Sequence, residues 1–252
     1  MPRRLERHPV WAVRCRFHEG KHMPEQVPFG AVEFAENPEP RCPCVLLLDT
    51  SGSMSGSPIA ALTSGVALYK QDLASDSLAA KRVEVAIVAF GGSVRTLSEF
   101  TSAEAFAPPA LSASGETPMG EAILRGIEMV RQRKDTYRSN GIQFYRPWVF
   151  LITDGVPTDS WHEAAAAIRK GEKEKAFTFW AVGTESANFD TLKEISSPER
   201  PPLKLDGMKF GELFRWLSNS QQSVSRSQPG ASSGVKVEDP THGPSGWASV
   251  PV

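Results

Sequence analysis

Short runs of apolar residues alternate with longer amphipathic stretches over most of this chain, a pattern that buried strands and surface helices produce. Two runs are almost continuously apolar, Val45–Leu48 and Trp148–Thr153, and a third covers Ala176–Val182. Continuous apolar runs of this length are typical of strands buried on both faces, as in a parallel sheet. Another strand is predicted over Val83–Phe90, with Val94–Leu97 returning beside it as a hairpin.

The segments between these strands carry apolar residues at helical spacing. Helices are predicted from Ser57 through Leu73, from Pro118 to about Arg133, in the Ala-rich stretch after Ser160, from Asn188 to Ile195, and from Phe210 onward. A last short strand is predicted over Leu203–Leu205. The repeated order of strand and helix indicates an α/β fold, with a parallel sheet and helices on both of its faces.

The two ends of the chain differ in composition from this central part. Residues 1–22 are basic without a clear period and are predicted to be a disordered leader, with a basic arm as the alternative. Met23 is a second candidate for the start of the folded protein. Residues 23–42 are expected to form an N-terminal arm, residues 43–222 the folded domain, and residues 223–252 a disordered tail rich in Ser, Gly and Pro.

Composition narrows the classes of partner. The 252 residues carry a formal net charge of -1 and three cysteines. This balance gives no overall attraction to nucleic acid or to an anionic membrane, and no apolar run approaches the roughly 20 residues that span a bilayer. Three cysteines cannot complete a disulfide framework, and the basic N-terminus lacks the apolar stretch of a signal peptide. We therefore expect a cytoplasmic protein with no nucleic-acid or membrane partner.

Polar residues with oxygen atoms follow or precede the buried elements. The first apolar run ends in Asp49, the second is followed by Asp154, and a hydroxyl stands directly before a predicted helix. Ligands in open α/β sheets bind beyond the carboxyl ends of strands, and carboxylates and hydroxyls suit Mg²⁺, Mn²⁺ or Ca²⁺ better than Zn²⁺. The sequence therefore predicts one divalent-cation site, with Mg²⁺ as the expected ion, made of Asp49, Ser51, Ser53, Thr117 and Asp154.

Each of these residues also has an ordinary structural explanation. Asp49 and the serines could form a turn that caps the first helix, and Thr117 before Pro118 could be a helix N-cap. Asp154 followed by Gly155 is a common turn dipeptide. Their occurrence together, in order and at the ends of buried strands, favours a metal site.

At these positions the chain resembles the von Willebrand factor A-type domain over about residues 30–220. The segment Asp49–Met54, Thr117 and the segment Thr153–Gly155 match that family's metal-ion-dependent adhesion site in order and approximate spacing. The resemblance implies a doubly wound, mostly parallel sheet with one antiparallel edge strand. It also implies direct metal oxygens from Ser51, Ser53 and Thr117, with Asp49 and Asp154 acting largely through water and hydrogen bonds.

Within that family the chain is similar to the bacterial tellurite-resistance-associated TerY type. The similarity lies in Arg41–Met54, preceded by Pro28-Phe29-Gly30, and in Phe150–Asp159. It implies a place in a stress-response or signalling module that includes kinases and phosphatases, one of which could be the partner.

Three further residues next to the motifs are candidates for supporting the metal or facing a partner. Glu116 would place a third carboxylate beside the cation, unless it points to solvent. Asp159 and Trp161 follow the second motif closely, and Trp161 could equally pack on a helix. Cys42 and Cys44 lack a second ligand pair, so we expect two buried thiols and no zinc site.

The leading hypothesis is a binding module without enzymatic activity, in which the cation bridges the domain to an acidic side chain of a partner protein. One alternative is a Mg²⁺-dependent phosphoaspartyl-type hydrolase with Asp49 as nucleophile. That chemistry needs a second Asp two residues later, where Ser51 stands, and a Lys near the phosphate, for which no candidate is evident. Another alternative is a scaffold whose site is vestigial.

Overall fold

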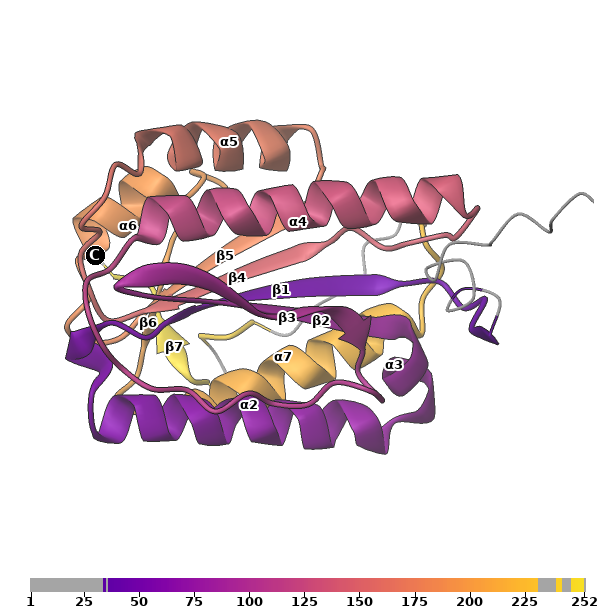
Figure 1. The fold of residues 1–252 in the computed structure, drawn as a ribbon, viewed down its shortest axis with the longest axis horizontal. Coiled ribbons are helices and arrows are strands. Elements are labelled where there is room, and N and C mark those ends of the chain that lie inside the picture. The colour runs from indigo at the N-terminus through magenta and orange to yellow at the C-terminus, as the bar shows by residue number, and fades with distance from the viewer. Residues whose placement is uncertain (1–33, 35, 231–238, 242–245, 252) are drawn as a thin grey trace, which may run out of the picture.

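The computed structural model describes residue 34 and residues 36–230, 239–241 and 246–251, in which helices cover both faces of a central sheet (Figure 1). The strands of this part of the chain lie in the order β3-β2-β1-β4-β5-β6-β7. They are β1 (Cys42–Asp49), β2 (Val83–Gly91), β3 (Ser93–Ser102), β4 (Trp148–Thr153), β5 (Thr178–Gly183), β6 (Leu203–Leu205) and β7 (Ala248–Ser249). The neighbouring pairs β2-β1, β1-β4, β4-β5 and β5-β6 are parallel. The two edge strands, β3 and β7, run antiparallel to their neighbours.

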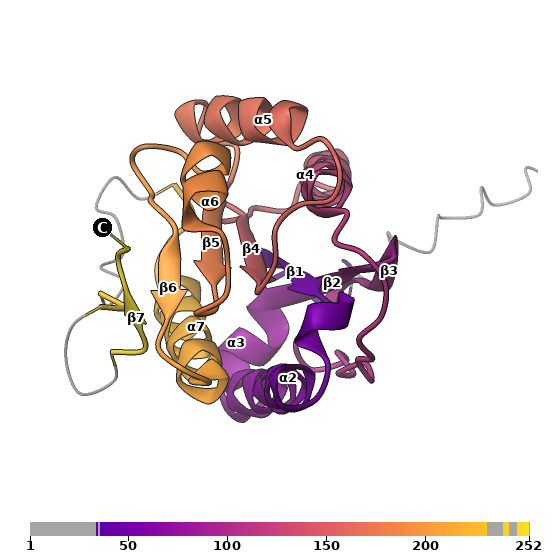
Figure 2. The same cartoon turned by 90° about the vertical axis from the view of Figure 1, so that its left-hand side faces the viewer.

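The helices divide between the two faces of the sheet (Figures 1 and 2). One face carries α2 (Ser57–Ser75), α3 (Ser77–Arg82) and α7 (Phe210–Ser225), and the other carries α4 (Met119–Ser139), α5 (His162–Lys173) and α6 (Phe189–Ile195). A short 3₁₀ helix, η1 (Gly52–Met54), joins β1 to α2. Within the described residues, no helix combines the length and the apolar character needed to cross a bilayer. The predicted doubly wound, mostly parallel α/β architecture is confirmed, but the described sheet has two antiparallel edge strands, β3 and β7, where one was expected.

The core explains why the first apolar run is continuous. In a strand, successive side chains point to opposite faces. Val45 and Leu47 belong to the core under α4 and α5, while Leu46 and Leu48 belong to the core under α2 and α7. All of these side chains are completely buried. Both faces of β1 therefore require apolar residues, and no position in the middle of the strand is left for a polar one.

A buried ion-pair network closes the amino end of the sheet. Glu84 is fully buried in β2 and accepts hydrogen bonds from Arg41 at 2.9 Å and from Arg133 at 2.7 and 2.8 Å. The hydroxyl of Tyr137 donates to the same carboxylate. Both guanidinium groups lie over the ring of Phe34, at 5.4 and 5.1 Å from its centroid. The end of the N-terminal arm is thereby fixed to the sheet, whereas most of the arm and the whole predicted leader lie outside the described residues.

The structure corrects the predicted disordered tail over residues 223–252. Helix α7 continues to Ser225, and β7 adds to the edge of the sheet next to β6. Trp247, directly before β7, is completely buried, and its ring lies 5.5 Å from that of Trp216. The composition of this segment could not reveal the contact, because the aromatic ring that meets Trp247 belongs to Trp216 of α7. Residues 231–238, 242–245 and 252 lie outside the described residues.

Candidate metal centre

The site lies where the winding direction of the sheet reverses. From β1 the chain winds outward to β2 and β3, whereas β4, on the other side of β1, leads to β5 and β6. Asp49 is the last residue of β1, and Asp154 follows the last residue of the adjacent parallel strand β4. Such a switch point is where open α/β sheets bind ligands. Figure 2 looks onto this end of the molecule.

The loop after β1 folds over the end of β4. The carboxylate Oδ1 of Asp49 accepts a hydrogen bond from the backbone N–H of Ser51 at 2.8 Å. The hydroxyls of Ser51 and Ser53 are hydrogen bonded at 3.0 Å, and Ser53 donates to Oδ1 of Asp154 at 2.7 Å. Ser51 is buried, whereas Ser53 is exposed. These residues therefore form a continuous chain of oxygen atoms that runs from the interior to the surface.

Thr117 joins this group from the loop before α4. Its backbone N–H donates to the hydroxyl of Thr158 at 3.1 Å, and its carbonyl accepts from the N–H of Thr158 at 3.0 Å. A Cβ atom placed on Gly155 would lie 3.3 Å from Oγ1 of Thr117 and 3.7 Å from Oδ2 of Asp49. Both oxygens therefore lie around Gly155, and the structure brings all five predicted site residues together.

Thr117 does not cap α4, contrary to its ordinary structural explanation. Pro118 occupies the N-cap position and provides no side-chain hydrogen bond. Instead, Asp159 accepts from the N–H groups of Gly120 and Glu121 at 3.0 and 2.8 Å. Asp159 thus satisfies the first turn of α4 from a distant loop, and the hydroxyl of Thr117 is left for another role.

The other two candidates lie at the rim. The side chain of Glu116 is exposed, and its backbone carbonyl accepts a hydrogen bond from the N–H of Gly92 at 2.7 Å. Trp161 is partly buried against the core under α4 and α5, and its ring stacks on that of His162 at 4.3 Å. Glu116 thus points to solvent, and Trp161 combines helix packing with a partly open face.

Thr153 is a further residue of the site, not predicted from the sequence, and it holds the carboxylate of Asp49 in place. Its hydroxyl donates to Oδ2 of Asp49 at 2.5 Å and accepts from the N–H of Gly155 at 3.1 Å. The available signal was its position as the last residue of the strand directly before Asp154. Thr153 was counted there as part of the apolar run, because a fully buried hydroxyl can look like a strand residue in such a pattern.

The two carboxylates are buried without a protein cation. Asp49 is completely buried and Asp154 is 7% exposed. Burial raises the pKa of Asp49, hydrogen bonds from Ser51 and Thr153 lower it, and the charge of Asp154 raises it again. In the part of the chain that the structure describes, no Arg, Lys or His forms an ion pair with either carboxylate. The site therefore concentrates negative charge that only hydrogen bonds compensate.

The residues present fit a hard divalent cation. Within the described residues, neither Oγ1 of Thr117 nor Oδ2 of Asp154 has a hydrogen-bond partner, although both residues are more than nine-tenths buried. Among the described residues, no three or more His, Cys, Asp and Glu side chains lie so that they alone could hold a metal ion. The donor set is thus two carboxylates with three hydroxyls, which suits Mg²⁺, Mn²⁺ or Ca²⁺ and not zinc.

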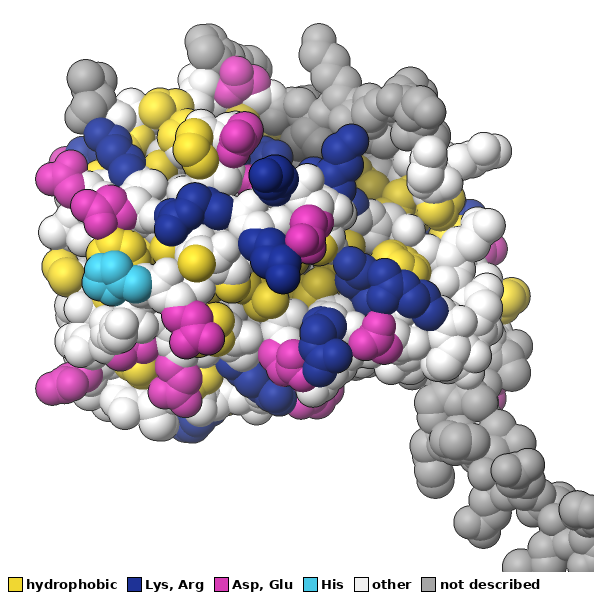
Figure 3. Space-filling model, turned by 90° about the horizontal axis from the view of Figure 1, so that it is seen from above, with side chains coloured by type: hydrophobic (Ala, Val, Ile, Leu, Met, Phe, Trp, Pro, Cys, Tyr) yellow, Lys and Arg dark blue, Asp and Glu magenta, His cyan; other side chains and the backbone are white. Residues whose placement is uncertain are grey.

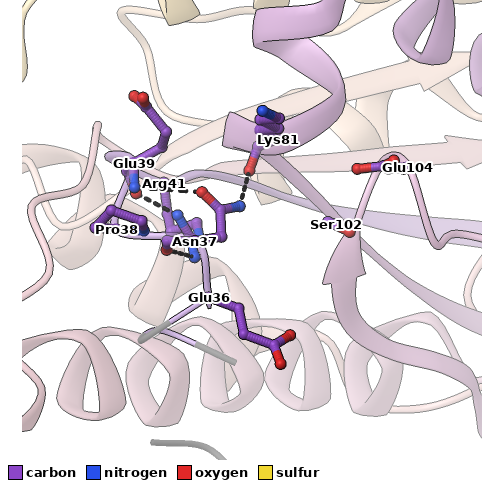
Figure 4. A pocket seen from close by; sticks show the side chains of 8 residues that line it. All are labelled: Glu36, Asn37, Pro38, Glu39, Arg41, Lys81, Ser102 and Glu104. Carbon is purple, nitrogen blue, oxygen red and sulfur yellow. Dashed lines mark hydrogen bonds between the residues drawn. The ribbon is translucent and has the colours of Figure 1, made fainter. Parts of the chain in front are cut away.

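Two hollows of the described surface lie away from these residues. A cavity of about 390 Å³ opens at the amino end of the sheet (Figure 4). Its polar groups are engaged with one another, since Arg41 donates to the carbonyls of Glu39 and Asn37, and Asn37 donates to the carbonyl of Lys81. A second hollow of about 340 Å³ lies between α5 and α6 beside Trp161. Figure 3 shows that Lys and Arg side chains are interspersed with Asp and Glu over the face that α4 and α5 form.

Comparison with known proteins places the chain in a family. The model of the von Willebrand factor type A domain matches residues 44–206, which is more than half of the chain. The chain therefore belongs to the von Willebrand factor type A domain family. A search of the curated proteins found no match.

Several solved structures have a similar fold. The chain is similar to a von Willebrand factor type A protein from Catenulispora acidiphila, with a TM-score of 0.58, 20% identity and coverage of 73% of this chain and 43% of that one. It is also similar to the pilus adhesin SpaC of Lactobacillus rhamnosus GG, with a TM-score of 0.58, 16% identity and coverage of 75% of this chain and 31% of that one. A third similar structure is the ArnB paralog VWA2 of Sulfolobus acidocaldarius, with a TM-score of 0.50, 19% identity and coverage of 72% of this chain and 45% of that one. The chain spans less than half the length of each of these proteins.

Proposed function

We propose that this chain is a metal-dependent protein-binding module. One divalent cation, expected to be Mg²⁺, binds at Asp49, Ser51, Ser53, Thr117 and Asp154 and is bridged to an acidic side chain of a partner protein. The observation that carries this proposal is the pair of buried carboxylates that no described cation of the protein neutralises, next to a hydroxyl without a hydrogen-bond partner in the described part of the chain.

The number and charge of the ligands support an outside carboxylate. Octahedral Mg²⁺ takes six oxygens at about 2.1 Å and usually keeps several waters. Five side chains, some acting through water, leave at least one position for another ligand. Two carboxylates roughly neutralise the divalent ion, so an incoming acidic group is not repelled. Ser53 is exposed, which supports access to the ion from outside.

The surroundings of Asp49 favour binding over hydrolysis. A phosphoaspartyl enzyme needs a carboxylate oxygen that can attack phosphorus, with a general acid nearby. Both oxygens of Asp49 already accept hydrogen bonds, from Ser51 and from Thr153. The residue two positions after Asp49 is Ser51, which cannot act as a carboxylic acid. We therefore propose a module without enzymatic activity.

The proposed setting rests on the resemblance of Arg41–Met54 and Phe150–Asp159 to the tellurite-resistance-associated TerY type. By that resemblance, the module acts in a bacterial stress-response or signalling system in the cytoplasm. Its partner would be a protein of the same system, such as a kinase or a phosphatase.

Calorimetric titration of metal-stripped protein with Mg²⁺, Mn²⁺ and Ca²⁺ tests the site. We expect one ion per chain in the wild type and none in Asp154→Ala. Asp190→Ala removes an exposed carboxylate on α6 and is the matched control, expected to bind like the wild type. Glu116→Gln should also bind normally, because that side chain points to solvent.

Two results would contradict the proposal. One is equal cation affinity in the wild type and in Asp154→Ala. The other is phosphatase activity toward an aryl phosphate that disappears in Asp49→Asn, which would replace the binding module by the hydrolase.

Once the cation site is established, the partner is sought by capture from a lysate with and without a chelator, followed by substitution of acidic residues on the captured protein.

A further inference from the structure

The edge of the sheet at β6 is covered by a segment from far along the chain. Strand β7 pairs antiparallel with β6, with Ala248 beside Leu205. The backbone carbonyl of Trp247 accepts a hydrogen bond from the N–H of Asp206 at 2.9 Å. This is the geometry of strand addition, by which proteins bind extended peptides at an exposed sheet edge.

The side chain of Trp247 is the anchor of this segment. It is completely buried, and its ring meets that of Trp216 of α7 at 5.5 Å and an interplanar angle of 60°. Trp216 in turn contacts Trp180 of β5 at 5.4 Å, and the guanidinium of Arg200 lies 4.3 Å from the centre of the Trp180 ring. In strand addition the main chain provides affinity and side-chain pockets provide specificity. The pocket here fits a large aromatic ring.

Several features make this contact weaker than the rest of the sheet. Strand β7 is only two residues long, Ser249 is exposed, and Val250 is 50% exposed. The indole N–H of Trp247 is buried without a hydrogen-bond partner among the described residues, which penalises its burial. The segment should therefore leave the edge without unfolding the core.

The connection to α7 is long, and its described residue Pro240 belongs to the segment, because its carbonyl accepts hydrogen bonds from the N–H groups of Trp247 and Ala248 at 3.1 and 3.3 Å. Residues 226–246 join the end of α7 to Trp247, and a chain of this length reaches roughly 70 Å when fully extended. A tethered segment rebinds with an effective concentration on the order of millimolar. Reversible opening with rapid reclosing is therefore the expected behaviour.

We propose that the β6 edge, with Trp216 at its base, is a binding groove for an extended peptide that carries a tryptophan followed by small residues. Residues 246–249 are the resident ligand of this groove, held in cis by the tether. The resident segment blocks the groove to peptides of the same chemistry until it is displaced. This site is separate from the cation site and does not depend on it.

The first experiment uses the full chain and a fluorescent synthetic peptide of residues 239–251. In Trp247→Ala the resident anchor is gone, so fluorescence anisotropy should show that the peptide binds at least tenfold more tightly than to the wild type. Val250→Ala alters an exposed residue of the same segment and is the matched control, expected to behave like the wild type. A peptide with Ala at the position of Trp247 should not bind. Equal peptide affinity in the wild type and in Trp247→Ala would overturn the proposal.

A second measurement, on the wild type alone, covers the case in which Trp247→Ala does not fold. Hydrogen exchange at the N–H of Asp206, which is bonded to Trp247, reports opening of the segment. We expect exchange at least a thousandfold faster than at the N–H of Leu47 in the central strand. Equal protection at the two positions would show that the segment opens only with the whole domain, and would overturn the proposal.

Discussion

At the amino end of the sheet, the buried carboxylate of Glu84 lies between the guanidinium groups of Arg41 and Arg133. At the carboxyl end, Asp49 and Asp154 are also buried, yet the described residues give them only hydrogen bonds from hydroxyls and an N–H group. Burying a charge is costly unless a charge of opposite sign or a metal accompanies it. The protein supplies its own cations at one end and, in our proposal, takes a cation from solution at the other.

The strand order explains how one sheet contains both arrangements. Strands β1, β2 and β4 are parallel neighbours, so their amino ends share one edge and their carboxyl ends share the other. The amino edge is covered by the arm that carries Arg41 and by the last turns of α4. The carboxyl edge is formed by loops, one of which carries the exposed Ser53. One end is therefore closed by structure and the other is open to a ligand.

The largest expected effect is at the closed end. Glu84→Ala leaves the buried guanidinium of Arg41 without the carboxylate that it pairs with, and loss of one partner of a buried pair costs about 3–5 kcal/mol. We expect the free energy of unfolding, measured by urea denaturation in the presence of a chelator, to fall by that amount. Glu104→Ala removes an exposed carboxylate nearby and should change it by less than about 0.5 kcal/mol. A loss below 1 kcal/mol in Glu84→Ala would show that the network contributes little.

At the open end, stability should depend on the cation instead. A ligand at a free concentration of one hundred times its Kd raises the free energy of unfolding by about 2.7 kcal/mol. We expect this gain from Mg²⁺ in the wild type and none in Asp154→Asn, again by urea denaturation. Without metal, Asp154→Asn should be as stable as the wild type or more so, because the repulsion with Asp49 is relieved. A large loss of stability in metal-free Asp154→Asn would instead indicate a structural role.

A smaller effect is expected at Thr117. Thr117→Val keeps the shape of the side chain and removes the hydroxyl, which has no hydrogen-bond partner among the described residues. We expect the cation affinity to fall about tenfold, or about 1.4 kcal/mol, with little change in metal-free stability. Thr117→Ser retains the hydroxyl and should retain the affinity in calorimetric titration. Equal affinities in Thr117→Val and the wild type would remove Thr117 from the ligand set.

The same contrast shows what the sequence could predict. The buried strands, the helices and the five candidate ligands follow from local patterns, because an apolar run that ends in a carboxylate is visible within about ten residues. The hydrogen-bonding partners were less visible. Asp159 caps α4 from a loop nearly forty residues away, as its hydrogen bond to Gly120 shows. Thr153 was hidden within an apolar run.

Long-range contacts were not predictable for a related reason. Glu84 is a charged residue within a strand pattern, and its partners Arg41 and Arg133 come from other elements. Trp247 stands alone in a polar segment, and its aromatic partner Trp216 lies on another element. In each case, the stabilising contact joins residues that only the fold brings together. Patterns along the chain therefore predict elements well and tertiary pairing poorly.

The smallest expected effect is a dependence on alkaline pH at the closed end, where Cys44 in β1 contacts Tyr69 and Gln221. Burial raises the pKa of the Cys44 thiol from its ordinary 9.0 to about 12, and the neighbouring polar side chains of Gln221 and Tyr69 offset part of this rise. Between these values the folded protein keeps a proton that the unfolded chain releases. The stability that this proton contributes is therefore complete below pH 9 and is lost as the pH rises toward 12.

This dependence is tested by comparing the wild type with Cys44→Ala in urea denaturation at several pH values. From pH 9 to pH 10 the thiol should account for a loss of about 1 kcal/mol, which Cys44→Ala should not show. The comparison of slopes is needed because burial also raises the pKa of Tyr69 and of the Cys42 thiol, and these groups remain in both proteins. Below pH 8 the difference in stability between the two proteins should not vary with pH. If the free energy of unfolding falls equally in the two proteins from pH 9 to pH 10, the Cys44 thiol ionises in the folded protein as it does in the unfolded chain. This end of the sheet would then be less closed than its burial indicates.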